Sequence, residues 1–385
     1  MRTSRSLVLS VGFFGFVLGA CAPERPSHAP RPARLPIDPQ AEPAPPEVPP
    51  ADGHAEMNTE YFLGSEAEER AQLAAFGRRI QELQKKVSTE RGQPIQRGFH
   101  AKSHACLSGT FELDPRRDPR SRFGLFADGA PNRRITVRFS NGVGWKQDDG
   151  ELDARGLAVK VFDVPGPKYL PDEPTTQDFL MTNAPTPVGR DAVEFMEFAK
   201  ANVRGQLFSF FFMATHPTTA APALARTVPI ESMVTQQYWS GGAYHLGAHQ
   251  AVKFSARPCD LRLSREPEKG SPDYLRKDLV AAAREGICMR FLVQFQSDPA
   301  NTPIENAAKA WSESDAPFVT VGRLVLPPQA VDAGATSACD AMAFTPWHAL
   351  PAHKPMGHIN RARRYVYRAS QEARQAVPSS APAHE

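Results

Sequence analysis

His100 lies in the segment RGFHAKSHACLSGTFEL, where the local pattern gives no structural reason for a histidine. A neutral imidazole near pH 7 can take a proton from one atom and return it to another. Two neutral polar residues further along, Ser140 in VRFS and Asn183 in DFLMTNAP, could complete a pocket for an uncharged substrate. Taken singly, the three would be an ordinary core histidine, a strand serine and a turn asparagine.

A second set of reactive side chains occupies the C-terminal segment NRARRYVYRASQEAR. Arg363, Tyr367 and Arg374 stand at i, i+4 and i+11, and eleven steps of about 100° bring them to one face of a helix. A guanidinium one turn from a phenol favours the phenolate, which is a hard anionic ligand suited to ferric iron. Arg361 and Tyr365 repeat the first spacing, but only the Tyr367 register has an arginine seven residues further on. A basic surface helix with two half-exposed tyrosines is the alternative.

The segments that carry these residues follow one another in a definite order. RGFHAK is followed by VRFS, DARGLAVKVF, DFLMTNAP and NRARRYVYRASQEAR. In this order they resemble the haem catalase superfamily, and most of all its short, minimal catalase-related peroxidases. The resemblance covers about residues 97–374. It implies an antiparallel β-barrel of about eight strands with surrounding helices, and haem b as the cofactor.

The resemblance also implies a role for each matched residue. On the peroxide side it implies that His100 is the distal base, that the Ser140 hydroxyl orients this base, and that the Asn183 amide binds the peroxide. On the other side it implies that Tyr367 is the axial iron ligand and that Arg363 is its partner. It also implies that three arginines pair with the haem propionates: Arg97, Arg138 and Arg374. Peroxide and a small organic reductant would be the partners.

The chain departs from full-length catalases near the distal residues. Phe99 and Ser103 stand where that family has valine before the histidine and glycine after HAK, and residues 186–189 replace a stretch with two phenylalanines. The altered pocket favours peroxidase chemistry with organic reductants or bulkier hydroperoxides over efficient catalase turnover. Because the chain ends at Glu385, soon after the predicted haem helix, we expect no flavodoxin-like domain and no bound NADPH.

Three other functions are compatible with parts of the pattern. A non-enzymatic haem-binding lipoprotein would need neither His100 nor Asn183, and a lipid-hydroperoxide isomerase of the allene oxide synthase type would fit the altered pocket. A metal site is the third, because histidines and cysteines cluster twice. The two groups are His100, His104 and Cys106, and His245, His249 and Cys259.

The N-terminus has the features of a bacterial lipoprotein signal peptide. Basic residues precede an apolar run over residues 7–18, which suits a signal peptide and is too short to span a bilayer. Because the run ends at LGAC, we expect residues 1–20 to be removed and Cys21 to be lipidated. An ordinary signal peptide is the alternative. The protein would be exported and held by its lipid alone on the periplasmic side, at the outer membrane.

Composition predicts one folded domain behind a tether. Residues 21–56 are rich in proline and predict a disordered linker, followed by a single domain over residues 57–385. The net charge of +3 comes from 45 basic and 42 acidic residues mixed along the chain, which argues against nucleic acid as a partner and leaves a homo-oligomer open. Four further cysteines could form two disulfides in any of three pairings or stay free: Cys106, Cys259, Cys288 and Cys339.

Periodicity predicts the elements that must position these residues. Ser65 and Glu68 form a capping box ahead of apolar residues at helical spacing, which predicts a helix. Segments that alternate polar and apolar residues predict strands: ITVRFS, GLAVKVF, HQAVKFSARP, CMRFLVQFQ and FVTVGRLVLP. Further helices are predicted over residues 190–203, 207–213, 277–284, 305–311 and 359–373. The pattern by itself predicts an α+β protein whose antiparallel strands begin to close a barrel.

Overall fold

The computed structural model describes residues 60, 62, 64–204, 206–217, 229–260 and 270–377. All of them belong to one compact unit, Glu47–Glu385. The predicted signal peptide, the tether and Cys21 lie outside these residues, so export, lipidation and the domain boundary at residue 57 stay predictions. No helix in the described part of the chain combines the length and apolar character needed to cross a membrane.

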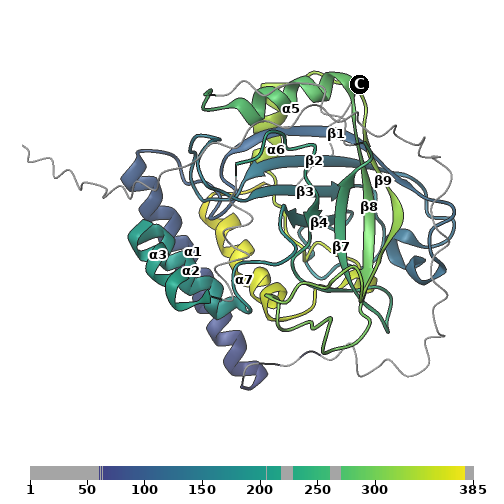
Figure 1. Cartoon of the computed structure of the whole chain (residues 1–385), viewed down its shortest axis with the longest axis horizontal. Helices are drawn as coiled ribbons and strands as arrows, with labels where there is room; N and C mark the ends of the chain where they lie inside the picture. Colours follow the sequence, from purple (N-terminus) through teal and green to yellow (C-terminus); the bar gives the residue numbers. More distant parts are fainter. Residues whose placement is uncertain are drawn as a thin grey trace, which may run out of the picture. The chain divides into compact units, whose positions relative to one another are not determined.

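A closed antiparallel β-barrel forms the centre of the structure (Figure 1). Its strands follow the order β5-β4-β3-β2-β1-β9-β8-β7, and pairing of β5 with β7 closes the ring, while β6 pairs with a further stretch of β7. The strands are β1 Ser103–Leu113, β2 Arg133–Asn141, β3 Arg155–Val161, β4 Gln177–Thr182, β5 Tyr238–Trp239, β6 Tyr244–His245, β7 Ala251–Pro258, β8 Ile287–Phe295 and β9 Phe318–Leu326. The predicted fold class, an antiparallel barrel with surrounding helices, is confirmed.

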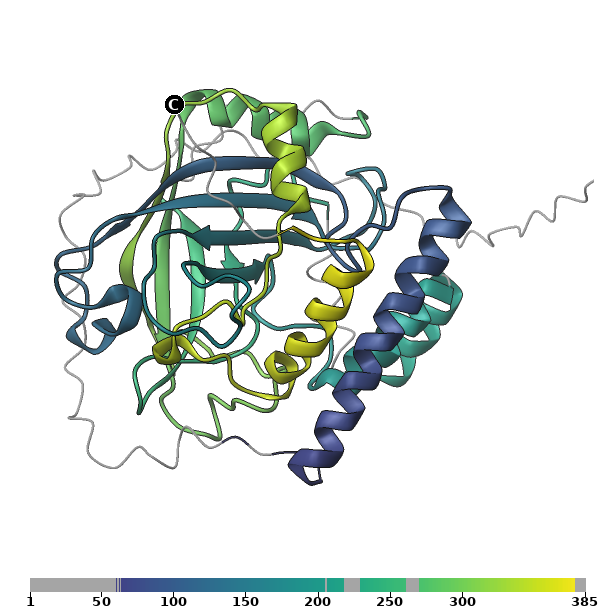
Figure 2. The ribbon, with the colours of Figure 1, turned by 180° about the vertical axis from the view of Figure 1, so that it is seen from behind.

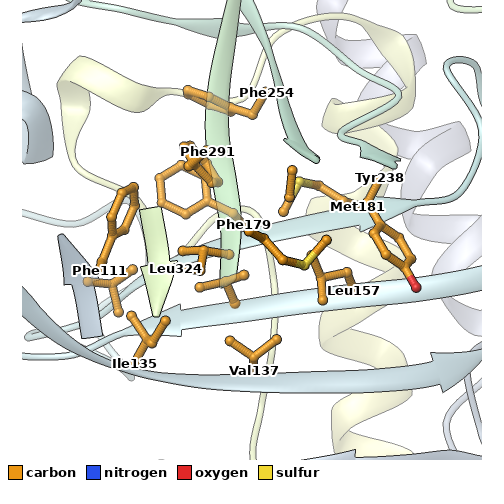
Figure 3. Close-up of a cluster of buried hydrophobic side chains, with 14 of the residues drawn as sticks. Phe111, Ile135, Val137, Leu157, Phe179, Met181, Tyr238, Phe254, Phe291 and Leu324 are labelled. Atoms are coloured by element: carbon orange, nitrogen blue, oxygen red, sulfur yellow. The ribbon is translucent and has the colours of Figure 1, made fainter. Parts of the chain in front are cut away.

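Alternation along the strands separates an apolar interior from an outer face that carries polar side chains. On β2, Val137 and Phe139 belong to the buried core, whereas Arg138 and Ser140 have the opposite strand parity. Figure 3 shows aromatic rings from several strands meeting in the interior, among them Phe111, Phe179, Phe254 and Phe291. Because side chains fill the interior, the polar residues of the site must act on the outer face.

Two long helices pack against each other along one side of the barrel. Figure 2 shows α7 His358–Ala373 between the barrel and α1 Glu66–Arg91, with α2 Ala192–Arg204 and α3 Gln206–Thr215 beside α1. The predicted capping box begins α1, since Ser65 Oγ accepts from the Glu68 N–H and the Glu68 carboxylate accepts from the Ser65 N–H. Two more helices pack against β1: α5 Tyr274–Glu285 and α6 Ala333–Ala341. The site residues of α7 therefore face the outer side of the barrel.

The predicted elements are found, with one exception. The five alternating segments lie in β2, β3, β7, β8 and β9, and four of the predicted helices correspond to α2, α3, α5 and α7. Residues 305–311 form turns instead of the predicted helix. Their polar groups bond elsewhere, because the Ala307 N–H donates to Arg190 O and the Trp311 indole donates to Pro303 O.

Two disulfides resolve the pairing that spacing leaves open. Cys106–Cys339 joins β1 to α6, and Cys259–Cys288 joins the residue after β7 to β8. These bonds also contradict the metal-site alternative, because each predicted group loses its thiol ligand. Within the described residues, no group of three or more histidine, cysteine or acidic side chains could hold a metal ion.

Candidate active site

The outer face of β2, β3 and β4 carries a row of small residues on which His100 rests. The register pairs Ser140 with Gly156 and Gly156 with Thr182, so these three residues stand side by side across the strands. A Cβ on Gly156 would lie 2.5 Å from His100 Nδ1 and 2.8 Å from Ser140 Oγ. Only glycine at this position leaves room for the imidazole against the sheet.

Three hydrogen bonds hold His100 in one orientation. Its φ of 60° lies in the left-handed region, which costs a non-glycine residue about 1–2 kcal/mol. The His100 N–H donates to Gly142 O at 2.8 Å, and Arg138 Nη2 donates to the His100 carbonyl at 2.9 Å. Ser140 Oγ lies 3.2 Å from His100 Nδ1, which is the contact that the family resemblance implies for this serine. The backbone and the ring are thus fixed together.

The surroundings of His100 favour the neutral imidazole. Burial of the ring is the main cause that lowers its pKa from 6.5 to about 4. The positive charges of Arg138, Arg363 and Arg97 lower the pKa further, and a hydrogen bond to the Asn141 backbone opposes them. At pH 7 the ring is therefore uncharged and able to accept a proton.

Helix α7 presents Tyr367 to the same space as His100. Both residues line two adjoining cavities, of about 100 and about 260 Å³. Arg363, one turn before Tyr367, also lines both, and its Nη1 donates to Asn360 Oδ1 at 2.9 Å and to Ser240 O at 3.3 Å. The predicted tyrosine and its arginine therefore lie together on the cavity side of α7.

The alternative register on α7 faces other partners. Tyr365 packs against the apolar cluster between α1 and α7, which includes Leu73 and Ile359. The Arg361 guanidinium is held by carboxylates, with Nε 2.6 Å from Glu69 Oε1 and Nη1 2.8 Å from Glu305 Oε1. Neither Arg361 nor Tyr365 lines the cavities that contain His100. The structure therefore favours the Tyr367 register.

Three arginines from separate elements converge on the C-terminal end of α6. Arg97 Nη2 donates to the carbonyls of residues 340 and 342 at 2.9 Å each, and Arg374 donates to the carbonyls of residues 340–342 at 2.7–3.2 Å. Arg138 Nε donates to Asp340 Oδ1 at 2.8 Å. The last carbonyls of a helix have no intrahelical partner and carry its negative dipole end, so they are suitable acceptors for cations.

The positive charges of this arginine cluster are only partly compensated. Among the described residues, Asp340 is the only carboxylate that forms an ion pair with Arg97, Arg138 or Arg374. Burial and the neighbouring arginines lower the pKa of Arg97 well below its usual value. Burial and the charge of Arg138 lower the pKa of Arg374 to about 10. Because all three line the smaller cavity, one end of that cavity attracts an anion.

The larger cavity is mostly apolar. Helices α2 and α3, the loop before β3 and residue 99 supply much of its lining: Phe99, Leu152, Phe195, Met196, Phe198 and Met213. The rings of Phe99 and Phe195 lie 5.3 Å apart. Residues 186–189 lack the two phenylalanines of full-length catalases, but Phe195 and Phe198 of α2 supply aromatic rings to the same cavity. A molecule in this cavity meets apolar walls beside the imidazole of His100.

The predicted distal amide, Asn183, lies outside the two cavities. Asn183 lines neither cavity, and its Oδ1 accepts a hydrogen bond from the Arg155 N–H at 2.7 Å. Thr182, the last residue of β4, lines both cavities instead. The reason is strand parity, because Thr182 shares the outer face with Ser140, and the chain turns immediately after it.

Asp153 is a further site residue that the sequence analysis did not single out. It lines the larger cavity, and its carboxylate accepts hydrogen bonds from the Gly142 and Val143 N–H groups at 3.1 Å. Burial raises its pKa to about 6. Its position two residues before β3, in DARG, is the signal that could have identified it. Through these bonds it fixes the loop that also binds the His100 backbone.

Comparison with known proteins agrees with this architecture. No family model matches the chain. A curated catalase of Methanosarcina barkeri is 24% identical over 264 residues, covering 60% of this chain and 49% of the relative. A fungal catalase structure is 19% identical and superposes with a TM-score of 0.61. The match covers 78% of this chain and 66% of the fungal chain. Catalase A of Saccharomyces cerevisiae has a TM-score of 0.58 at 19% identity, covering 76% and 64%.

The chain has the catalase fold. It spans about half the length of the curated relative that it matches. In this catalase-fold chain, the segments that carry the resemblance come together in space: VRFS on β2, DARG at the start of β3, DFLMT on β4, and Arg363 and Tyr367 on α7. The site residues thus lie where the shared fold brings distant segments together.

The ionisation of His100 gives a first prediction. Since the folded-state pKa is about 4 and the unfolded value is near 6.5, the unfolded chain binds the proton first as the pH falls. Keeping His100 neutral therefore lowers stability progressively between pH 6.5 and about 4. A histidine NMR titration, assigned with a His100→Gln variant, should show a midpoint near pH 4. A midpoint near 6.5 would show that the ring is not desolvated as described.

Proposed function

We propose that this protein binds haem b and acts as a peroxidase that reduces organic hydroperoxides and hydrogen peroxide at the expense of a small organic reductant. The observation that carries this proposal is the shared lining of the two cavities. Neutral His100 approaches from the barrel, Tyr367 approaches from α7, and three arginines lie at one end. A base, an anionic iron ligand and an anion-binding end are the groups that such a cofactor and reaction require.

The donor set of the site fits haem b. Three guanidiniums and one carboxylate leave an excess of two positive charges, which equals the charge of two propionates. Arg97, Arg138 and Arg374 would hold these propionates. Tyr367 would supply a phenolate to ferric iron, with the Arg363 guanidinium one helical turn away to favour the ionised form.

Each polar residue near the peroxide position has a distinct task. Haem iron held by Tyr367 would supply the two electrons for O–O cleavage, which the organic reductant would replace. His100 takes the proton from one peroxide oxygen and returns it to the other, which then leaves as water or an alcohol. Ser140 orients the ring at 3.2 Å, and the Thr182 hydroxyl, on the other side of Gly156, binds the peroxide in place of an amide.

The larger cavity supports the preference for hydroperoxides with apolar substituents. Hydrogen peroxide gains little from apolar walls, whereas a buried alkyl group contributes about 0.8 kcal/mol per CH₂. Phe195, Met196 and Met213 line this cavity, which also includes His100. An organic reductant would find the same apolar surface. These walls favour peroxidase chemistry over the disproportionation of hydrogen peroxide.

Haem ligation predicts a difference between two neighbouring tyrosines. Tyr367→Phe removes the phenol that lines both cavities, so we expect haem affinity to fall at least about tenfold and the ferric absorption spectrum to change. Tyr365→Phe, the matched control on the same helix, should bind haem as the wild type does. Absorbance titration of the apo protein with ferric haem measures both. A larger loss for Tyr365→Phe would move the ligand to the other register.

The distal residues predict a second contrast in turnover. Thr182→Val keeps the side-chain shape and removes the hydroxyl, so kcat/KM for an alkyl hydroperoxide should fall about 100- to 1000-fold, as for loss of one positioned hydrogen-bond donor. Asn183→Ala leaves the Arg155 N–H unpaired and should lower the free energy of unfolding by about 1–3 kcal/mol, with a smaller effect on kcat/KM. Haem-loaded variants are assayed by oxidation of an organic reductant.

The alternative functions are separated by giving the haem-loaded protein either hydrogen peroxide or a fatty-acid hydroperoxide. Oxygen evolution, reductant oxidation and the hydroperoxide product are then measured together. Oxygen evolution without reductant oxidation would indicate a catalase, and a rearranged hydroperoxide without reductant consumption would indicate an isomerase. Bound haem without turnover would indicate a haem carrier. A greater loss in kcat/KM for Asn183→Ala than for Thr182→Val would return the distal role to the amide.

A further inference from the structure

The Cys106–Cys339 disulfide lies directly beside the arginine cluster. Cys339 belongs to the last turn of α6 and immediately precedes Asp340, whose side chain and carbonyl accept hydrogen bonds from the arginines. Cys106 lies on β1 opposite Arg138 in the register with β2. The bond therefore connects the acceptor end of α6 to the strand pair that carries one of the donors.

Apolar packing places the same disulfide against the wall of the smaller cavity. Cys339 and Phe344 form a buried cluster against which Cys106, Ala158 and Leu180 pack. Ala158, Leu180 and Phe344 also line that cavity. The disulfide thus supports both the apolar wall and the charged end.

The arginine cluster needs a fixed set of acceptors. Three cations that repel one another meet here: carbonyls hold Arg97 and Arg374 at 2.7–3.2 Å, and the Asp340 carboxylate holds Arg138 at 2.8 Å. Such hydrogen bonds weaken steeply when the acceptor moves out of line. Residues 340–342 are also fastened on the α7 side, because Met342 bridges to Val377 and Gln371 Nε2 donates to Phe344 O at 3.1 Å. On the barrel side, the disulfide is the covalent link.

We propose that the Cys106–Cys339 disulfide positions the arginine cluster for the anionic end of the cofactor, and that its reduction weakens cofactor binding without unfolding the barrel. This inference rests on the proposed haem function. In the reduction, a small dithiol gives two electrons and two protons to the disulfide. The S–S bond breaks to two thiols, and the dithiol becomes a cyclic disulfide. Cys106 is only partly buried, so a small reductant can reach the bond.

The second disulfide provides a matched control. Cys259–Cys288 fastens the end of β7 to the start of β8, and neither cysteine lines the cavities described here. Both bonds join neighbouring elements of one barrel. If removal of a disulfide only lowers the stability of the barrel, removal of either bond should have the same effect. An effect on the arginine cluster should appear only when Cys106–Cys339 is removed.

The test uses Cys106→Ser/Cys339→Ser and Cys259→Ser/Cys288→Ser in the full chain. Hydrogen–deuterium exchange of the apo proteins should be faster at residues 338–344 only in the first variant. Absorbance titration with ferric haem should show an affinity at least about tenfold lower for that variant, and a smaller change for the control. Arg97→Gln should weaken binding in the wild type and much less in the first variant, because coupled groups are not additive.

Two results would overturn the inference. One is an unchanged haem affinity in Cys106→Ser/Cys339→Ser, and the other is an equal loss in the control. If the first variant does not fold, stepwise reduction of the wild type with dithiothreitol, followed by thiol mass spectrometry, must show haem release that tracks the free Cys106 thiol. Release that tracks Cys259 instead contradicts the inference. A wild type that binds no haem at all would refute the proposed function instead.

Discussion

Three guanidiniums, one on a buried arginine and two on half-buried ones, lie beside a single carboxylate and are the constraint on which the rest of the site depends. Arg97 comes from the segment before β1, Arg138 from β2 and Arg374 from the end of α7, and they meet at the C-terminus of α6. Bringing like charges together in a partly dry environment is unfavourable unless strong acceptors compensate. The free carbonyls of α6 provide part of this compensation. A bound dianion would provide the remainder, which is why we propose a cofactor that carries two carboxylates.

The same charges act on the distal side of the site. Arg138 and Arg97 add to burial in lowering the pKa of His100, so two arginines that would bind the propionates also help to keep the proposed base neutral. The position of that base depends on a separate feature, the row of Ser140, Gly156 and Thr182 across three strands. A glycine in the middle lets the imidazole approach the sheet between two hydroxyl side chains. In the proposed function, proton transfer and cofactor binding would therefore both depend on one outer face of the barrel.

Sequence reasoning succeeded where a pattern had one structural solution. Alternating strands and the spacing of Tyr367 from Arg363 and Arg374 both translate directly into faces of strands and helices. Sequence reasoning did not predict α6, because its sequence, AGATSACDA, has no apolar stripe of helical period. Such a helix of small residues is stabilised by packing and by its disulfide. Disulfide partners more than 200 residues apart in sequence are likewise decided by the closed barrel.

The predicted distal amide shows how a motif match and the lining of a cavity can differ by one residue. Asn183 matches the family motif, yet β4 ends at Thr182, and only the residue of matching parity faces the outer side of the barrel. Residues 305–311 show the complementary error, since helix-forming residues form turns when tertiary bonds take their backbone groups. In both cases the decisive information lies in partners far along the chain.

The most direct measurement compares the binding of ferric haem and of its dimethyl ester to the full-length apo protein. The ester keeps the iron and the ring but lacks both propionate charges. We predict that haem binds with a strong Soret band and that the ester binds roughly 100-fold more weakly, because two charge-assisted contacts to the arginine cluster are lost. Equal affinity for both, or no Soret band with either, would contradict the central role given to Arg97, Arg138 and Arg374.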